Sequence, residues 1–505
     1  MANLHERLGA LSPEALKGIR RGIEKESLRV RADGQLALTP HPAELGSPLT
    51  HPRVTTDFSE AQLELITGVH ESVDACVDEL GRIHQYVYRA IGDEMLWAGS
   101  MPCGLPAEEA IPIAFYGASN VGRVKSVYRM GLAHRYGRRM QMISGIHYNW
   151  SMPGVSTDAY FALIRNFRRH SFLLLYLFGA SPAVCSSFVA GRRHDLQPLT
   201  RNTLYMPHAT SLRMGRLGYQ SEAQATLAVS YNGLERYAAM LQAALTQAYP
   251  AYEALGIFDP AGGYRQLATS LLQIENEFYG TIRPKRTILP GERPLHALRQ
   301  RGVEYVEVRC LDLDPFVPVG IDAQTMRFID VLLLHCLLSD SPPDTPQEIA
   351  ALERNQQLVA ARGREPGLTL DRGGKEVVLA EWAARILDEC TTIAAALDAV
   401  HGGSAHRDAL ESAHSALRDA AELPSARVLD VMARDFDDSY VGFTRARSEQ
   451  IRTALLERPF AAETASYFRD MAQKSVEEQH RIEAADTLPF ENYRENYLSP
   501  SSLDA

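Results

Sequence analysis

Five short segments of this chain carry ionisable side chains at alternate positions, and most of those side chains are carboxylates. In an extended strand, residues two apart lie on the same face. The pattern therefore predicts strands that each turn acidic groups to one side of a sheet. The segments are residues 22–26, 57–66, 145–149, 273–279 and 303–309.

The alternation places particular pairs of residues on a common face. Several carboxylates on one face repel one another unless a cation lies between them, and hard divalent cations prefer oxygen ligands. The pattern therefore predicts a metal-dependent enzyme, and a single histidine among the acids suggests a site that takes Mg2+ or Mn2+. The pairs are Glu24 with Glu26, Gln62 with Glu64, His147 with Asn149, Glu275 with Glu277, and Glu307 with Arg309.

Each segment taken alone also has an ordinary explanation. Alternate charges are common on exposed strand edges, and a lone strand histidine is more often a core or surface residue than a ligand. A surface Glu–Arg pair contributes little stability. Leu63 and Leu65 flank Glu64 and make an exposed edge less favoured there. The basic run 282–286, with Arg283, Lys285 and Arg286, is either a solvated loop or a phosphate-binding segment.

Composition narrows the class of protein. The chain has 505 residues, is 45% hydrophobic and 23% charged, and carries a formal net charge of −10. These values are ordinary for a globular protein. The negative charge and the lack of a dense basic block argue against nucleic acid as a partner. The longest apolar run, residues 172–180, is too short to span a bilayer.

The six cysteines are widely spaced and form no Cys-x-x-Cys pair. We therefore expect reduced, mostly buried thiols. Disulfides are rare in the cytosol, and the chain begins without the apolar segment of a signal peptide, so we expect a cytoplasmic location. The cysteines are Cys76, Cys103, Cys185, Cys310, Cys336 and Cys390.

Apolar spacing predicts helices in both parts of the chain. Strand-like segments fade after about residue 340, and no linker divides the chain. We expect one α+β domain over residues 1–505, with a sheet region at 1–335, a mainly helical part at 336–490 and a frayed tail at 491–505. The expected helices are 75–96, 158–178, 222–248, 324–338, 346–362, 380–400, 405–420, 426–434 and 461–485.

Several catalytic motifs are missing from the sequence. It has no P-loop, no dinucleotide-binding fingerprint after a strand, no His-Glu-x-x-His and no Gly-x-Ser-x-Gly. This disfavours P-loop, Rossmann, zincin and α/β-hydrolase enzymes. The small-residue loop 116–123 could approach a ligand closely, which is a weak signal alone.

Six ordered blocks resemble the proteobacterial glutamate–cysteine ligases (γ-glutamylcysteine synthetases). The resemblance runs from about residue 15 to 330 and continues loosely through 366–370 and 483–490. It implies a fold related to glutamine synthetase, in which a curved, mainly antiparallel sheet forms a funnel with helices outside. The blocks are residues 21–29, 55–60, 143–149, 211–213, 273–279 with 282–286, and 304–309.

The resemblance also implies a reaction. ATP would phosphorylate the γ-carboxylate of glutamate, and the cysteine amine would attack this γ-glutamyl phosphate, giving γ-glutamylcysteine in the first step of glutathione synthesis. Divalent metal, Mg2+ or alternatively Mn2+, would let the two polyanions approach each other. The substrates would be L-glutamate, L-cysteine and ATP. We expect a monomer that binds neither nucleic acid nor membrane.

The resemblance assigns roles to matched positions. The expected metal ligands are Glu24, Glu26, Asp57, Glu64, His147 and Glu307. The expected catalytic residues are Arg309, Arg129 and Glu307. The expected cysteine site has Arg213 and Tyr219 at the carboxylate, with Tyr128, Leu132, Gln141 and Tyr279 around it. Glu275, Glu277 and the adenine pocket stay unassigned. Trp150 and Cys310 depart from the family pattern, and we expect both on the face away from the metals.

Three alternatives remain. A ligase that uses ammonia would not need Arg213 and Tyr219, since ammonia has no carboxylate to hold. A catalytically inactive metal-binding relative would be expected to lack one of the acids, yet all six expected ligand positions are acid or histidine. A fused enzyme that also makes glutathione would need a much longer chain.

Overall fold

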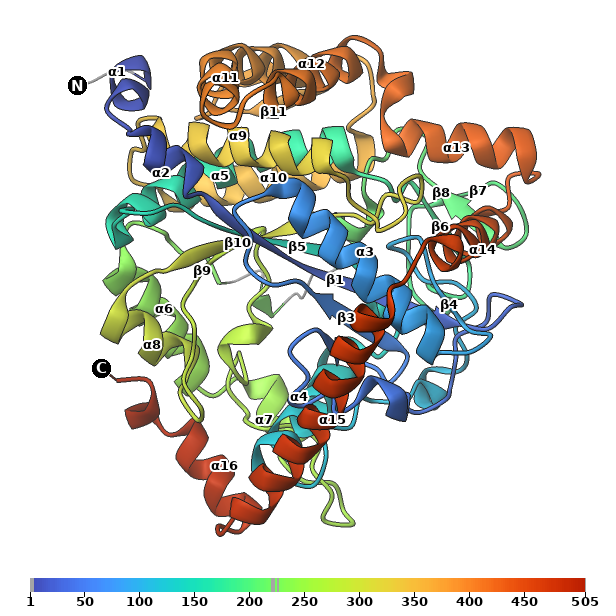
Figure 1. The fold of residues 1–505 in the computed structure, drawn as a ribbon. Helices are drawn as coiled ribbons and strands as arrows, with labels where there is room; N and C mark the ends of the chain where they lie inside the picture. Colours follow the sequence, from blue (N-terminus) through green and yellow to red (C-terminus); the bar gives the residue numbers. More distant parts are fainter. Residues whose placement is uncertain (1–3, 219–222, 225–226, 505) are drawn as a thin grey trace.

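The computed structural model describes residues 4–218, 223–224 and 227–504. A seven-stranded antiparallel sheet in the order β2-β3-β1-β5-β10-β9, with β4 paired to β1, crosses the middle of the molecule (Figure 1). Its strands are β1 (Arg20–Val30), β2 (Val54–Thr56), β3 (Gln62–Ile66), β4 (Met95–Leu96), β5 (Ile146–Ser151), β9 (Ile282–Lys285) and β10 (Tyr305–Leu311).

One face of this sheet is apolar and is covered by helices. Tyr148, Trp150 and Cys310 belong to its core, so the two positions that depart from the family pattern face away from the acids, as expected. Figure 1 shows a helical layer above the sheet and a second pair of helices outside it. The layer contains α3 (Val73–Ala90), α5 (Thr157–Phe178), α9 (Ala323–Leu338) and α10 (Pro346–Arg362), and the outer pair is α11 (Leu379–His401) and α12 (Ala405–Arg418).

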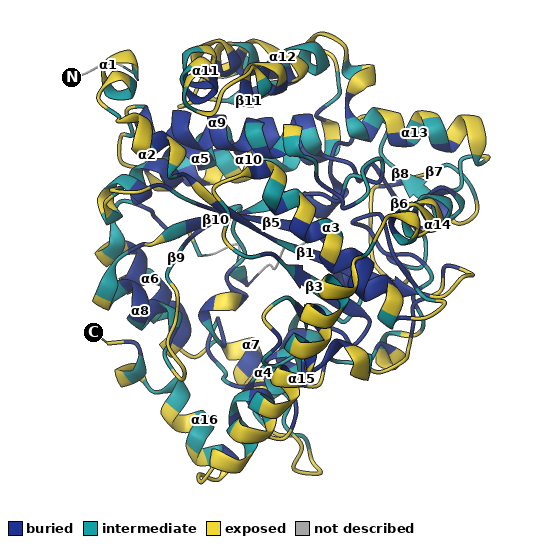
Figure 2. Cartoon of the chain, viewed as in Figure 1, coloured by how far each residue is buried: buried dark blue, intermediate teal, exposed yellow. Residues whose placement is uncertain are grey.

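Burial follows this layering: the sides of α5 and α9 that face the sheet are buried, and the outer sides of α11 and α12 are exposed (Figure 2). The start of α9 is set by Asp322, whose carboxylate accepts a hydrogen bond from the Thr325 N–H. Among the described helices, none combines the length and the apolar character that crossing a membrane requires.

The opposite face of the sheet carries the acids and is enclosed by other segments. These are α4 (Asn120–Tyr136), α6 (Leu234–Thr246), α7 (Pro250–Leu255), α8 (Pro294–Arg301), α15 (Ala462–Ala485) and α16 (Phe490–Leu498). The remaining elements lie at the periphery: α1 (Leu4–Gly9), α2 (Pro13–Lys17), α13 (Pro424–Asp435), α14 (Tyr440–Glu457), the small sheet β6 (Ala183–Cys185), β7 (Gln197–Pro198) and β8 (Thr203–Tyr205), and the hairpin β11 (Thr369–Asp371) and β12 (Glu376–Val378).

The predicted α+β architecture is confirmed: the main sheet is antiparallel and the C-terminal third is helical apart from the β11–β12 hairpin. Most predicted helices are present within a few residues of their expected bounds. The helix predicted at 75–96 stops at Ala90, because Met95 and Leu96 pair with β1 instead. The helix predicted at 222–248 begins at Leu234, and residues 222, 225 and 226 lie outside the described part of the chain. Several helices were not predicted, among them α4 and α14.

Three predictions are wrong. Residues 273–279 do not form a strand; Glu275–Glu277 is a 3-10 turn, and the strand lies just after it at β9. Residues 490–498 form α16, so the tail is not frayed there. Cys103 and Cys185 form a disulfide, while Cys76, Cys310, Cys336 and Cys390 are free and buried. The two bonded cysteines are 82 residues apart, so a short-range spacing pattern in the sequence could not predict the bond.

Candidate active site

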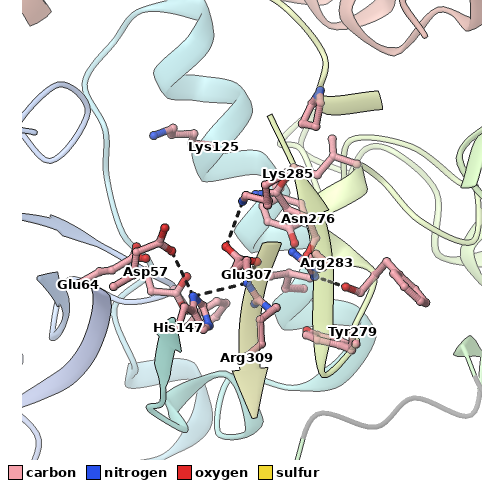
Figure 3. A pocket seen from close by; sticks show the side chains of 18 of the residues that line it. Asp57, Glu64, Lys125, His147, Asn276, Tyr279, Arg283, Lys285, Glu307 and Arg309 are labelled. Atoms are coloured by element: carbon pink, nitrogen blue, oxygen red, sulfur yellow. Dashed lines mark hydrogen bonds and ion pairs between the residues drawn. The ribbon is translucent and has the colours of Figure 1, made fainter. Parts of the chain in front are cut away.

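A cavity of about 920 Å³ opens on the acidic face of the sheet. Side chains from β1, β3, β5, β9 and β10 converge in it, and α4 lies across from them (Figure 3). Every expected site residue that the structure describes lines this cavity: Glu24, Glu26, Asp57, Glu64, Tyr128, Arg129, Leu132, Gln141, His147, Arg213, Tyr279, Glu307 and Arg309. Tyr219 lies outside the described residues.

Strand register brings four of the predicted ligands together. Glu26 is paired with Glu64 across β1 and β3, and Glu24 is paired with His147 across β1 and β5. The His147 Nδ1 lies 3.2 Å from Glu24 Oε2, and Asn149 donates to Glu24 Oε1 at 2.9 Å. One ligand atom each of Glu24, Glu64 and His147 lie within 4.8 Å of one another. This spacing and donor set suit a hard divalent cation.

At Glu64 and Glu26, nearby protein cations do not offset burial and the repulsion of other acids. Burial, together with the charges of Glu24, Asp57 and Glu26, raises the pKa of Glu64 well above its usual value. Burial and the charge of Asp57 likewise raise the pKa of Glu26 to about 8. A bound cation would relieve this repulsion, so the residues present fit the divalent metal that the acids predict.

The acid on the neighbouring strand β10 has protein partners instead. Glu307 accepts from Arg309 Nη1 at 2.8 Å and pairs with Lys285 Nζ at 3.1 Å. Burial opposes ionisation of Glu307, but Lys285 and Arg309 outweigh it and hold its pKa well below the usual range. Glu307 therefore stays ionised beside two cations. Such a group of fixed charges can hold a transferring phosphoryl group.

Helix α4 contributes a second set of cations. Ser119 begins the helix by accepting a hydrogen bond from the Gly122 N–H, and Lys125 and Arg129 then follow one turn apart on the side facing the cavity. Arg129 donates to the carbonyl of Asp57, and its guanidinium lies 4.5 Å from the ring centre of Tyr116. Burial and the charge of Arg129 lower the pKa of Lys125 to about 8.

Arg213 lies at the floor of the cavity and is almost completely buried. Its Nη2 donates to the carbonyl of Arg309 at 2.9 Å, and its Nη1 is 3.8 Å from Asp312 Oδ1. A Cβ on Gly145 would lie 1.9 Å from Arg213 Nη2, so this position must lack a side chain. The same glycine donates its backbone N–H to Glu26 Oε2 at 2.7 Å. Gly145 therefore connects Arg213 to the acidic site.

The aromatic side of the cavity joins several segments. Gln141 donates to the Tyr279 hydroxyl at 3.2 Å, and Tyr128 and Leu132 approach from α4. The rings of Tyr279 and Tyr136 lie edge-on to each other, with their centres 6.1 Å apart. These contacts form a small, partly polar compartment.

The other end of the cavity is apolar and was not located from the sequence. It is bounded by the loop before α8 and by α16: Arg293 donates to the Tyr497 carbonyl at 2.7 Å and lies 4.7 Å from that ring centre. The apolar and aromatic side chains that line this end are Val121, Ile288, Leu289, Pro290, Ile482, Tyr493 and Tyr497.

Glu275 and Glu277, left unassigned from the sequence, are occupied by structural contacts. Glu275 pairs with Arg293 at 2.7 Å, and Glu277 pairs with Arg135 at 2.9 Å. In the basic run, Arg283 and Lys285 line the cavity, while Arg286 donates to the carbonyl of Arg301. Lys125 and Asn276 also line the cavity and were missed. The spacing of Lys125 and Arg129, four residues apart on one helix face, was the available signal for Lys125.

Comparison with known proteins gives a consistent result. Residues 9–359 match the family described as glutamate-cysteine ligase. A glutamate–cysteine ligase of Pseudomonas entomophila is 47% identical over 97% of this chain and 96% of its own. One from Pseudomonas aeruginosa is 48% identical over 94% of this chain and 92% of its own.

Two solved structures are also similar. A glutamate–cysteine ligase from Francisella tularensis, crystallised in complex with AMP, superposes with a TM-score of 0.91 at 36% identity, covering 96% of this chain and 98% of that one. A bifunctional glutathione synthetase from Pasteurella multocida superposes with a TM-score of 0.71 at 25% identity, covering 91% of this chain and 57% of that one.

Proposed function

This chain belongs to the glutamate–cysteine ligase family and is an enzyme of the first step of glutathione synthesis, and we propose how its cavity carries out the reaction. ATP would transfer its γ-phosphoryl group to the γ-carboxylate of glutamate. The cysteine amine would then attack the acyl carbon, and phosphate would leave as the C–N bond forms. The observation that supports this most is that two kinds of acid line one cavity. Other acids and burial raise the pKa of Glu64, whereas Lys285 and Arg309 hold the pKa of Glu307 low.

The acidic side of the cavity would hold the metal. Glu24, Glu64 and His147 supply the most closely spaced ligand atoms, Glu26 and Asp57 add to them, and Glu307, which is also paired with Lys285 and Arg309, completes the proposed set. Mg2+ bound there would neutralise phosphate charge while ATP and glutamate approach each other. Mn2+ would be an alternative because one of the ligands is an imidazole.

The cations of β9 and β10 would hold the group in transfer. Burial opposes the charge of Arg309, but Glu307 outweighs it and raises the pKa of Arg309 further, so the guanidinium stays charged throughout. Burial is likewise outweighed by Glu307 at Lys285, whose pKa is raised. Arg309 would contact the transferring phosphoryl group and the acyl oxygen, and Arg129 would approach the phosphates from α4. Fixed donors of this kind stabilise developing charge without reorganisation.

The amine substrate would occupy the aromatic compartment. Arg213 would hold the cysteine carboxylate, together with Tyr219, while Tyr128, Leu132, Gln141 and Tyr279 would surround the side chain. The apolar end between α16 and residues 288–290 offers the flat surface that an adenine ring requires. The Francisella enzyme was crystallised with AMP, which supports a nucleotide site on this fold.

Phosphate release tests the proposal directly. The enzyme would be given ATP, Mg2+ and glutamate, with cysteine, 2-aminobutyrate or ammonia added in turn. We expect turnover with cysteine and 2-aminobutyrate and little with ammonia. Turnover with ammonia alone would instead make this an ammonia-using ligase. Absence of turnover with every amine would favour an inactive metal-binding relative.

A matched pair of variants ties the result to the cavity. Glu307→Gln should lower kcat by about 10²–10³-fold. Glu304→Gln, three residues earlier and exposed, should retain activity. Equal rates in both variants at saturating Mg2+ would contradict the role given to Glu307.

We also propose that the enzyme works as a monomer in the cytoplasm and binds small molecules without nucleic acid or membrane. The net charge of −10 supports the exclusion of nucleic acid. The four free thiols agree with a reducing compartment, whereas the Cys103–Cys185 disulfide is the observation that opposes it. Rapid thiol alkylation in freshly lysed cells, followed by mass determination in solution, would test both statements.

A further inference from the structure

A second group of ligand-type side chains lies in the helical layer behind the sheet. His170 comes from α5, and His335 and Cys336 come from α9. One ring nitrogen of each histidine and the Cys336 Sγ lie within 4.8 Å of one another. None of these three described residues lines the substrate cavity. The group is therefore separate from the proposed Mg2+ site.

The three side chains lie close together; His335 and Cys336 are buried and His170 is half-buried. Cys336 Sγ lies 3.9 Å from His170 Nδ1, and the centres of the two imidazole rings are 5.5 Å apart. His335 is 1% exposed and Cys336 is fully buried. Two imidazoles and one thiol at this spacing form an uncommon neighbourhood for a helix–helix core, which is usually filled by apolar side chains alone.

The position of His335 has the form of a metal ligand held by a carboxylate. Its Nε2 lies 2.8 Å from Glu389 Oε2 on α11. Its Nδ1 is buried and has no hydrogen-bond partner among the residues that the structure describes. Metal-binding histidines usually donate their other ring N–H to a carboxylate in this way. A cation at Nδ1 would also remove the cost of a buried polar atom without a partner.

A cation bound by this group must displace the thiol proton of Cys336 to gain the sulfur as a ligand.

We propose that His170, His335 and Cys336 bind a thiophilic divalent cation of the Zn2+ type, with Glu389 orienting His335. The ligand set selects against Mg2+, which requires oxygen ligands, and in favour of Zn2+. In the binding step the S–H bond breaks, its proton passes to solvent, and the sulfur lone pair bonds to the cation. No oxidant or reductant is required. The bound cation would tie α5 to α9 behind the sheet.

A surface cleft lies beside the site. A cleft of about 530 Å³ is lined by Leu338, Ser339 and Glu389, among others. Ser339 Oγ lies 3.4 Å from His335 Nε2, so this cleft reaches the residues that contact the group. Glu389 is 59% exposed on its side chain and forms the boundary between the cleft and the buried imidazole.

Co2+ is a direct optical probe for such a site. The full-length enzyme would be stripped with chelator, kept in excess Mg2+ and titrated with Co2+, and then with Zn2+. We expect a thiolate-to-metal charge-transfer band that saturates at one Co2+ per chain, is lost on adding Zn2+, and is accompanied by release of about one proton. The described lining of the substrate cavity contains no cysteine, so Co2+ bound there cannot produce the band.

Variants identify the ligands. Cys336→Ala should abolish the band, whereas Cys76→Ala, which removes a buried free thiol elsewhere, should retain it. Glu389→Gln changes a half-exposed side chain and should weaken Zn2+ affinity by about 10–100-fold in a folded protein. The absence of a band in the wild-type enzyme, or a band that persists in Cys336→Ala, would overturn the proposal. If Cys336→Ala does not fold, unchanged Zn2+ affinity in Glu389→Gln would overturn it instead.

Discussion

Arg135 Nη1 lies 2.9 Å from Glu277 Oε1 in an ion pair whose two side chains have no solvent exposure. Glu277 also accepts from the Tyr136 hydroxyl at 2.6 Å, and its other oxygen accepts from the Gln273 N–H at 2.7 Å. Both carboxylate oxygens of this acid are therefore occupied by protein donors. It differs in this respect from Glu64, whose pKa is raised by burial and by the charges of Glu24, Asp57 and Glu26.

Removing Glu277 should therefore cost stability. Glu277→Ala leaves the Arg135 guanidinium buried without its partner, and we expect the free energy of unfolding to fall by about 3–5 kcal/mol. Denaturant unfolding measures this change. Glu449→Ala, at an exposed position of α14, is the control and should have little effect. A loss below about 1 kcal/mol for Glu277→Ala would contradict the structural role.

Replacing Glu64 should weaken metal binding without lowering the stability of the metal-free protein. Glu64→Gln removes one of several mutually repelling acids, so the metal-free protein should be at least as stable as wild type. Mg2+ stabilises the folded state only by binding it, and the upward shift in Tm on adding Mg2+ should shrink in this variant. Differential scanning with and without Mg2+ measures both effects, with exposed Glu109→Gln as the control. An undiminished Mg2+ shift would show that Glu64 is not a ligand.

Gly145 tests the position of Arg213. In Gly145→Ala the new methyl group would lie 1.9 Å from Arg213 Nη2, so the guanidinium must move. Displacement of a binding group by about 1 Å can cost ~10²-fold in rate, and we expect a loss of that size in kcat/KM for cysteine. Gly81→Ala, where nothing lies within 4 Å of the added Cβ, should behave as wild type. Normal kinetics for cysteine in Gly145→Ala would argue against a carboxylate site at Arg213.

The apolar end of the cavity predicts a contribution from the C-terminal helix. Tyr497→Ala removes an aromatic face that lines the cavity and stacks against Arg293, and KM for ATP should rise about tenfold with kcat little changed. Tyr467→Ala on α15, where the residue is 52% exposed, is the matched control. If KM for glutamate rises instead, the adenine ring binds elsewhere.

Stability should depend on pH through His51. Its Nδ1 accepts from the N–H groups of Arg53 and Val54, at 3.1 and 2.8 Å, and burial, with the charge of Arg53, lowers its pKa to about 4. The unfolded chain binds this proton near pH 6.5 while the folded protein does not, so stability is lost as the pH falls from about 6.5 towards 4. For one such group, the free energy of unfolding falls by about 1.4 kcal/mol per pH unit in this range.

The difference between variants isolates that contribution. His51→Asn keeps an acceptor oxygen but does not titrate, so its unfolding free energy should fall less steeply than that of wild type between pH 6.5 and 4.5. His194→Asn, at an exposed position, should follow the wild-type curve. Parallel curves for all three proteins would contradict the assignment.

Strand periodicity alone predicts much of the acidic face. In a strand, residues two apart share a face, so Glu24 and Glu26 in β1, or Glu307 and Arg309 in β10, were expected on one side wherever the strand formed. The apolar partners on the other face, such as Trp150 and Val308, had to lie in a core. These inferences hold because they depend only on the local geometry of an extended chain.

The same alternation failed at 273–279. The pattern of Glu275 and Glu277 looks as strand-like as that of Glu24 and Glu26, yet each of these two carboxylates has an arginine partner and caps nearby backbone N–H groups. Arg135, the partner of Glu277, is distant from it in the sequence, and Arg293, the partner of Glu275, follows it only after a turn. Helix α16 was missed for a related reason, because its order depends on contacts with Arg293 and α4.

The sequence by itself therefore determined which side chains share a strand face and, through six ordered blocks, the family. The tertiary structure alone decided which acids meet, because convergence depends on strand order and on the register between segments that are not neighbours in the sequence. It also decided which acids are paired with protein cations. The Cys103–Cys185 bond and the contact between His170 and Cys336 likewise depend on the tertiary structure. Periodicity is a local property of the backbone, whereas charge balance is the sum over every neighbour that the fold supplies.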